Sequence, residues 1–138
     1  MPNRILKESV CTSPNIERLS WFEEVCFYRL LVQCDDFGRL DARPSLLRAR
    51  LFPLREDIDG AELETAMAAL EAVGLIERYE VEGIPYLQLV TWEKHQRIRT
   101  QRFRYPPPVW MDTEVLLPRY EKKNLVENSV ENVGKCGK

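Results

Sequence analysis

The segment from Asp59 to Trp92 constrains the fold most strongly, because a helix pattern, a glycine and two strand patterns follow one another without a break. Asp59 can cap the helix, and Glu62, three residues later, can reach back to complete a capping box. Apolar residues then recur with the helical period, which predicts one buried face about 120° wide. They are Leu63, Ala66, Met67, Leu70 and Val73.

The end of this helix leads directly into a predicted β-hairpin. Gly74 can adopt the left-handed conformation that ends a helix. The runs 75–81 and 84–92 read as strands, and Glu82-Gly83 between them can form a two-residue hairpin turn. Pro85 cannot donate to a β-ladder, so we expect the second strand to lie at an exposed sheet edge there. A helix followed by a hairpin late in a small domain is typical of a winged-helix domain.

Two more helices are expected before this segment. Ser20 can cap the first, which runs to about Cys34, and its apolar residues point nearly all round. Such a helix is either central in its domain or half of an oligomer interface. Pro44 suits the first turn of the second helix, and Pro53 ends it. The sequence therefore predicts an α+β fold of the winged-helix type, with a three-helix core, a short strand and a C-terminal β-hairpin wing.

The length of 138 residues suffices for one domain and a tail. We expect a winged-helix domain with a basic extension at 1–108, and a linker or disordered tail at 109–138, where charge is balanced and periodicity is low. The chain has no run of 18 apolar residues and no signal-peptide pattern. The four cysteines lack the spacing of a metal site or a disulfide framework, which favours a reduced, cytoplasmic protein with apolar cysteines in or near its core.

Candidate catalytic and metal-binding residues are few. Asp35 and Asp36 are adjacent, but we expect them to accept backbone hydrogen bonds at a turn instead of binding a metal. His95 is the single histidine and could act as a general base, although its cationic neighbours favour an ordinary surface residue. The chain has no phosphate-cradling glycine loop, nucleophile elbow or zinc spacing. We therefore expect no enzyme activity, no metal and no cofactor.

The charges are unevenly distributed, although the net charge is only −2. Residues 56–82 hold nine acids and one arginine, so we expect phosphates to repel the third helix. Residues 94–104 hold five cations and no acid, close to Phe103 and Tyr105. This pattern predicts electrostatic, weakly sequence-selective DNA binding, whereas the alternative is a solubilising linker. The candidate DNA-binding residues are Lys94, Arg97, Arg99, Arg102 and Arg104, with Arg43 and Arg50 as possible extensions that sequence alone does not place nearby.

Several separated motifs between residue 4 and about residue 106 resemble one family. They are Ile5-Leu6-Lys7-Glu8-Ser9, Leu19-Ser20-Trp21-Phe22-Glu23-Glu24, Asp35-Asp36-Phe37-Gly38-Arg39, Arg50-Leu51-Phe52-Pro53, Tyr86-Leu87-Gln88-Leu89 and Trp92-Glu93-Lys94-His95-Gln96-Arg97. The chain is similar to the N-terminal domain of DnaD-like replisome organisers, the replication initiation proteins of Gram-positive prophages. The resemblance implies a winged helix, a role in starting phage DNA replication, self-association and a second, C-terminal domain behind a flexible linker.

The chain departs from that family pattern in its length and in its acidic third helix. We expect a fragment, a truncated gene product or a stand-alone paralogue, and functions of the family's C-terminal domain are not carried over. The expected partners are DNA, a helicase loader or other replisome protein, and a second copy in a homodimer or higher oligomer. Two alternatives stay open at this point: a winged-helix transcriptional regulator and a protein–protein scaffold without DNA binding.

Overall fold

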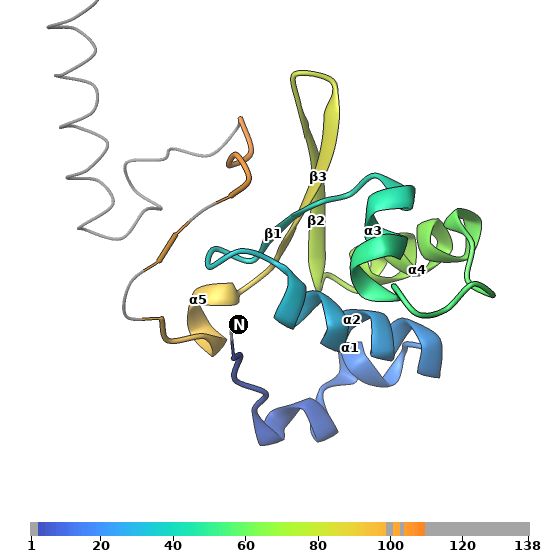
Figure 1. Ribbon diagram of the computed structural model, residues 1–138. Helices are drawn as coiled ribbons and strands as arrows, with labels where there is room; N and C mark the ends of the chain where they lie inside the picture. Colours follow the sequence, from blue (N-terminus) through green and yellow to red (C-terminus); the bar gives the residue numbers. More distant parts are fainter. Residues whose placement is uncertain (1–2, 99–100, 103, 110–138) are drawn as a thin grey trace, which may run out of the picture. The chain divides into compact units, whose positions relative to one another are not determined.

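The computed structural model describes residues 3–98, 101–102 and 104–109 (Figure 1). The chain divides into two units, residues 1–106 and 107–138. The predicted tail at 109–138 lies outside the described residues except for Val109, and so do Arg99 and Phe103. The elements of the first unit are η1 (Glu8–Thr12), α1 (Pro14–Glu17), α2 (Trp21–Gln33), β1 (Arg39–Asp41), α3 (Pro44–Leu51), α4 (Gly60–Ala72), β2 (Ile76–Val81), β3 (Ile84–Leu89) and α5 (Trp92–His95).

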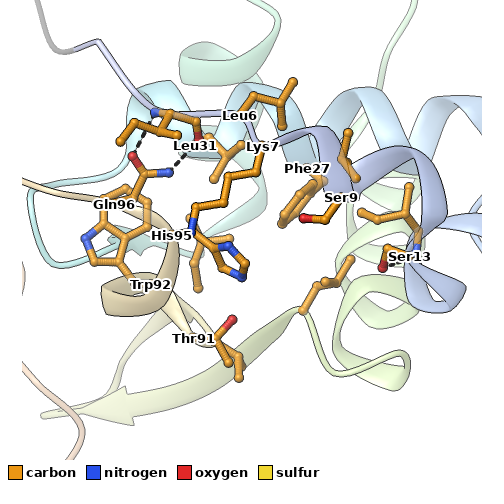
Figure 2. A pocket seen from close by; sticks show the side chains of 16 residues that line it. Leu6, Lys7, Ser9, Ser13, Phe27, Leu31, Thr91, Trp92, His95 and Gln96 are labelled. Carbon is orange, nitrogen blue, oxygen red and sulfur yellow. Dashed lines mark hydrogen bonds between the residues drawn. The ribbon is translucent and has the colours of Figure 1, made fainter.

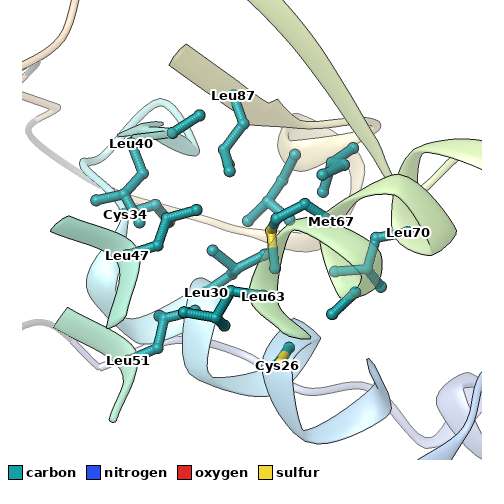
Figure 3. Close-up of a cluster of buried hydrophobic side chains, with 14 of the residues drawn as sticks. Cys26, Leu30, Cys34, Leu40, Leu47, Leu51, Leu63, Met67, Leu70 and Leu87 are labelled. Atoms are coloured by element: carbon teal, nitrogen blue, oxygen red, sulfur yellow. The ribbon is translucent and has the colours of Figure 1, made fainter. Parts of the chain in front are cut away.

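This unit has an α+β fold, with helices packed on a three-stranded antiparallel sheet of order β1-β3-β2. Alternate strand residues point to opposite faces of a sheet. One face supplies Leu40, Ile76, Leu87 and Leu89 to a core that also holds buried residues of α2, α3 and α4 (Figure 3). We call this the inner face, and the opposite one the outer face. Among the described residues, no helix is long and apolar enough to cross a membrane.

The predicted helix ends are confirmed where side chains fix them. Ser20 and Glu23 form the expected capping box at the start of α2. At the start of α4 only half of the predicted capping box forms: the Asp59 side chain accepts a hydrogen bond from the Glu62 amide, at 2.8 Å. Gly74 follows the other end of α4 with φ +82°. Its amide donates to the Glu71 carbonyl and the Leu75 amide to the Leu70 carbonyl, which is the Schellman pattern.

The hairpin turn is also confirmed, because Glu82 and Gly83 both have positive φ, as a type I′ turn requires. The expectation that the second hairpin strand lies at a sheet edge is wrong: β3 is the central strand. Pro85 is tolerated there because it lies at the end of the β1 ladder: β1 ends at Asp41, opposite Tyr86, and the Pro85 carbonyl accepts a hydrogen bond from the Ala42 amide at 2.9 Å, which needs no proline N–H group. Trp92 was expected in this strand and instead begins α5.

Core composition follows the sequence pattern with few exceptions. Val73, expected on the apolar face of α4, is only partly buried, and Leu46 of α3, also expected on an apolar helix face, is exposed. Cys26 and Cys34 are buried as predicted, and burial raises the pKa of each thiol to about 12. Both are free thiols in the structure, as is the exposed Cys11.

Helix α2 is apolar on two opposite sides. Cys26, Leu30 and Leu31 are buried in the core. On the other side Trp21 is 84% exposed, Val25 40% and Val32 44%, with the half-buried Tyr28 between them. These four residues, separated by steps of four, three and four, form what we call the α2 stripe. The helix is therefore a core element that also presents, on its other side, apolar residues with the spacing of a coiled-coil seam.

Candidate nucleic-acid interface

The candidate site is organised by the turn between α2 and β1. The Oδ1 atom of Asp35 accepts hydrogen bonds from the backbone amides of Phe37, at 2.9 Å, and Arg39, at 3.0 Å. Gly38 completes the turn with φ +78°, and a Cβ atom at this position would lie 2.9 Å from the Trp92 ring. The expectation that this aspartate satisfies backbone donors at a turn is confirmed.

The two aspartates also bind the chain about 70 residues further on. The Oδ2 atom of Asp35 accepts from the amides of Arg104, at 3.0 Å, and Tyr105, at 3.2 Å. The Oδ2 atom of Asp36 accepts from the Arg102 amide at 2.9 Å, and the Asp36 amide donates to the Arg102 carbonyl at 3.3 Å. We call the described residues 101–102 and 104–106 the basic strap. Its backbone is fixed by the aspartates, while the side chains of Arg102 and Arg104 are exposed.

The strap lies against the outer face of the sheet. The Tyr79 hydroxyl donates to the Pro106 carbonyl at 2.6 Å. The Tyr105 ring centre lies 6.2 Å from that of Tyr86, which in turn lies 5.7 Å from that of Tyr79. Gln101 donates to the Asp36 carbonyl at 3.1 Å, so the strap is held at both ends.

The negative charges beneath the strap are compensated locally. Arg4 contacts the Asp36 carboxylate at 3.2 Å and donates to the carbonyls of Leu31 and Cys34 at the end of α2. Its guanidinium lies over the Trp92 ring. Burial raises the pKa of Asp35, whereas the hydrogen bonds that its carboxylate accepts from four backbone amides lower this pKa. Neither aspartate needs the arginine side chains of the strap as partners.

The structure places the predicted DNA-binding residues unequally. Lys94, Arg97, Arg102 and Arg104 are all exposed, and Arg99 lies outside the described residues. Arg43 was only a possible extension. Its guanidinium pairs with Asp41 at 2.7 Å, and Asp41 lies opposite Tyr86 in the sheet register. Asp41 and Tyr86 are cross-strand partners, so their side chains lie on the same face of the sheet, and the Arg43–Asp41 pair lies beside Tyr86. The structure therefore brings Arg43 to the tyrosines of the strap region.

The charge of Arg50 acts on the same carboxylate. Burial would raise the pKa of Asp41, but the hydrogen bonds and charge of Arg43, together with the charge of Arg50, lower it. Arg50 lies on α3, whose N-cap is Arg43, and its charge favours the ionised form of Asp41. Its side chain is exposed.

Sequence reasoning missed one cation and one aromatic residue of this surface. The Lys7 ammonium donates to the Lys94 carbonyl at 2.7 Å, across a separation of 87 residues, and adds an exposed charge beside α5. Figure 2 shows Lys7 next to His95. Tyr86 was interpreted only as part of the second hairpin strand and of one family-like motif. No local signal in the sequence pairs either residue with the basic segment, because both contacts are long-range.

His95 is exposed at the end of α5. It lines a mostly apolar cavity of about 130 Å³ between the N-terminal segment and α5 (Figure 2). In the part of the chain that the structure describes, no group of three or more His, Cys, Asp or Glu side chains could share a metal ion.

The acidic face of α4 is partly neutralised by a residue from the sheet. Arg78 on β2 contacts Glu64 at 2.6 Å and Glu71 at 3.1 Å. The sequence showed one arginine among the nine acids of residues 56–82, but it did not show that this arginine pairs with these two glutamates. Glu62 near the start of the same helix is exposed. The face is thus less negative than the sequence suggested, but its one cation is engaged.

No family model, no curated protein and no solved structure matches this chain. The resemblance to DnaD-like replisome organisers stays a prediction that rests on the motifs quoted above.

Proposed function

We propose that this chain is a nucleic-acid-binding module of winged-helix architecture that helps to start phage-type DNA replication in the cytoplasm, by binding and assembly and without catalysis. The observation that carries this proposal is the basic strap. Two aspartates hold its backbone, and its arginine side chains are exposed. A loose solubilising linker would not need such fixation.

The order of elements supports the architecture. Helix α2, strand β1, helices α3 and α4, and the β2–β3 hairpin follow one another, and β1 pairs with β3 of the hairpin. That is the element order of a winged helix, with the hairpin as its wing. The family resemblance was argued from separate motifs and leads to the same architecture. A fold alone does not assign a function, so the proposed DNA binding has to be argued from the charged surface.

The cationic surface is suited to phosphates for a physical reason. The strap amides are already paired, so its arginine side chains can turn to a ligand without releasing the backbone. Exposed guanidinium groups form charge-assisted, often bidentate, hydrogen bonds to phosphate. Helix α4, which reads bases in many winged-helix proteins, presents glutamates here, and its neighbouring arginine is engaged by two of them. This helix is therefore a poor partner for a phosphate backbone, which argues against the alternative of a sequence-specific transcriptional regulator.

The first prediction concerns the salt dependence of DNA binding. Neutralising about five phosphates gives a log–log slope near −4.5, and a loss of a few hundred-fold in affinity between 50 and 200 mM salt. Replacing Arg102 and Arg104 together by Ala should make that slope shallower by about two and weaken all sequences alike. Fluorescence anisotropy with labelled oligonucleotides measures both quantities.

The matched control removes the same charge elsewhere. Arg18 ends α1 and Arg55 lies in the α3–α4 loop, and both are exposed. The Arg18→Ala, Arg55→Ala double variant should keep the slope of the wild-type protein. Equal losses in the two double variants would show that only the net charge matters and that the strap is not the binding site.

The α2 stripe supports the expected self-association, and it favours an assembly role beside DNA binding. Its seam-like spacing lets two helices pack against each other, as in a coiled coil. We predict a homodimer at micromolar concentration. Placing a charge in this seam by Val25→Glu should raise the dimer dissociation constant by about tenfold or more, because an unpaired carboxylate would be buried.

Sedimentation velocity over a range of concentrations measures this equilibrium. Ala68→Glu is the control, since Ala68 is an exposed residue of α4. A protein that stays monomeric at every accessible concentration would refute the dimer. A Val25→Glu variant that dimerises like the control would place the interface elsewhere.

A helicase loader or another replisome protein is the further partner that the family resemblance implies.

A further inference from the structure

We infer that the strap surface binds unpaired DNA in preference to duplex DNA, because two accessible tyrosine rings lie among its cations. This inference rests on the proposed function and narrows its substrate class. The rings belong to Tyr86 on β3 and Tyr105 on the basic strap.

The two tyrosines come together from strand β3 and from the basic strap, which follows α5 in the chain. Their ring centres are 6.2 Å apart and the ring planes are inclined by 52°. Both side chains are only partly buried. Tyr79 stacks against Tyr86 from the strand β2 side, at 5.7 Å and 27°. Tyr79 is itself buried, and its hydroxyl is bonded to the strap carbonyl of Pro106. It therefore packs against Tyr86 from the neighbouring strand, and Tyr86 and Tyr105 are the partly exposed rings of the three.

Cations lie on both sides of the pair. Arg43 pairs with Asp41, the cross-strand partner of Tyr86, and Arg104 precedes Tyr105 in the chain. A strand whose phosphates follow these two arginines carries its bases across the tyrosines. The backbone bonds of Asp35 to Arg104 and Tyr105 fix the position of one cation and one ring together.

The rings decide between the two forms of DNA. Charge alone favours a duplex, because the duplex has the higher linear charge density. In a duplex, however, the base faces are already stacked on one another, and the tyrosines meet only sugars and base edges. In a single strand the base faces are free to stack on aromatic side chains, and this stacking tolerates every sequence. A preference for the single strand is therefore a signature of the rings and not of the arginines.

The test compares two probes and two substitutions at one position. The probes are a labelled 15-nucleotide single strand of mixed sequence and its blunt duplex. Tyr105→Leu keeps an apolar side chain but removes the ring, and Tyr105→Phe keeps the ring. We expect the wild-type protein to bind the single strand more tightly at 100 mM salt. Tyr105→Leu should weaken that binding by about 5- to 150-fold, as the loss of one stacked base predicts. Its duplex affinity should change by less than about twofold, and Tyr105→Phe should bind both probes like the wild type.

The outcomes separate this inference from the proposed function. A wild-type protein that prefers the duplex, or a Tyr105→Leu variant that weakens both probes equally, would overturn the inference and leave electrostatic DNA binding intact. Failure of the wild-type protein to bind either probe at 50 mM salt would refute the proposed function itself. The wild-type preference and the Tyr105→Phe variant decide the matter even if Tyr105→Leu lowers stability.

Discussion

Asp35→Asn should release the basic strap while leaving the turn before β1 intact. The two carboxylate oxygens of Asp35 have separate tasks. Oδ1 accepts from the turn amides of Phe37 and Arg39, and Oδ2 accepts from the strap amides of Arg104 and Tyr105. Asparagine has one acceptor oxygen and one donor nitrogen. If the asparagine oxygen accepts from the turn amides, the side-chain NH2 group faces the two strap amides. Because all of these groups are donors, no hydrogen bond can form between them.

The expected result is a local loss of structure with a moderate effect on stability. The strap loses two hydrogen bonds to a charged acceptor, which corresponds to about 3–6 kcal/mol if the chain does not relax, and less if the amides reach water. Hydrogen–deuterium exchange should therefore accelerate strongly at Arg104 and Tyr105 and stay slow at Phe37 and Arg39. Affinity for a single strand should fall with it, because the cation and ring positions are no longer fixed.

Asp57→Asn is the matched control, because Asp57 is exposed and contacts only Arg55, at 3.7 Å, among the ion pairs of the described residues. It should leave exchange at the strap unchanged. Strap amides that stay equally protected in Asp35→Asn would contradict the anchoring role. A variant in which the turn and the strap open together would show that Asp35 stabilises the fold as one unit.

Gly38→Ala should destabilise the fold more than any other glycine-to-alanine change at a positive φ in the described chain. At φ +78° a side chain is strained, which costs about 1–2 kcal/mol. The added Cβ would also lie 2.9 Å from the Trp92 ring. Trp92 cannot move freely, because it is buried and its Nε1 atom donates to the Asp36 carbonyl at 2.8 Å. Overpacking adds about 1–3 kcal/mol, so we expect a total loss of about 2–5 kcal/mol.

Gly74→Ala provides a control with the same backbone conformation and a different environment. Gly74 has φ +82°, and a Cβ there would meet no atom within 4 Å. This variant should lose only the backbone contribution of about 1–2 kcal/mol. Urea unfolding followed by tryptophan fluorescence measures both variants. Equal losses would show that Trp92 relaxes around the new methyl group and that the contact does not restrict this turn.

Local patterns in the sequence predict the elements of this fold well. Ser20, Asp59 and Gly74 mark helix ends through interactions within a few residues, and Glu82-Gly83 determines its own turn. The expectation for Pro85 was wrong because strand order depends on β1, which pairs from more than 40 residues away. A proline shows that one ladder position is unpaired, but it does not show which strand is missing.

The candidate site was only half predictable for the same reason. The run of cations without acids is visible in the sequence, and it correctly identified Arg102 and Arg104 as exposed cations. The partners that hold this run are Asp35 and Asp36, 66 to 70 residues earlier in the chain. A pair of adjacent aspartates usually accepts hydrogen bonds within its own turn. This expectation was correct for Oδ1 of Asp35, but it did not predict that Oδ2 binds the strap. Arg43 and Tyr86 lie at the site because of the register between β1 and β3, which local sequence patterns do not predict.

The most direct test of this account is a map of the DNA contact by amide chemical-shift changes, on addition of a short single strand to the isotopically labelled chain. We predict the largest changes at Arg102, Arg104 and Tyr105 of the strap, followed by Tyr86 and Arg43. Residues 62–71 on the exposed face of α4 should change little. The largest changes on that helix, with an unaffected strap, would contradict the account, because the acidic helix would then be the element that binds DNA.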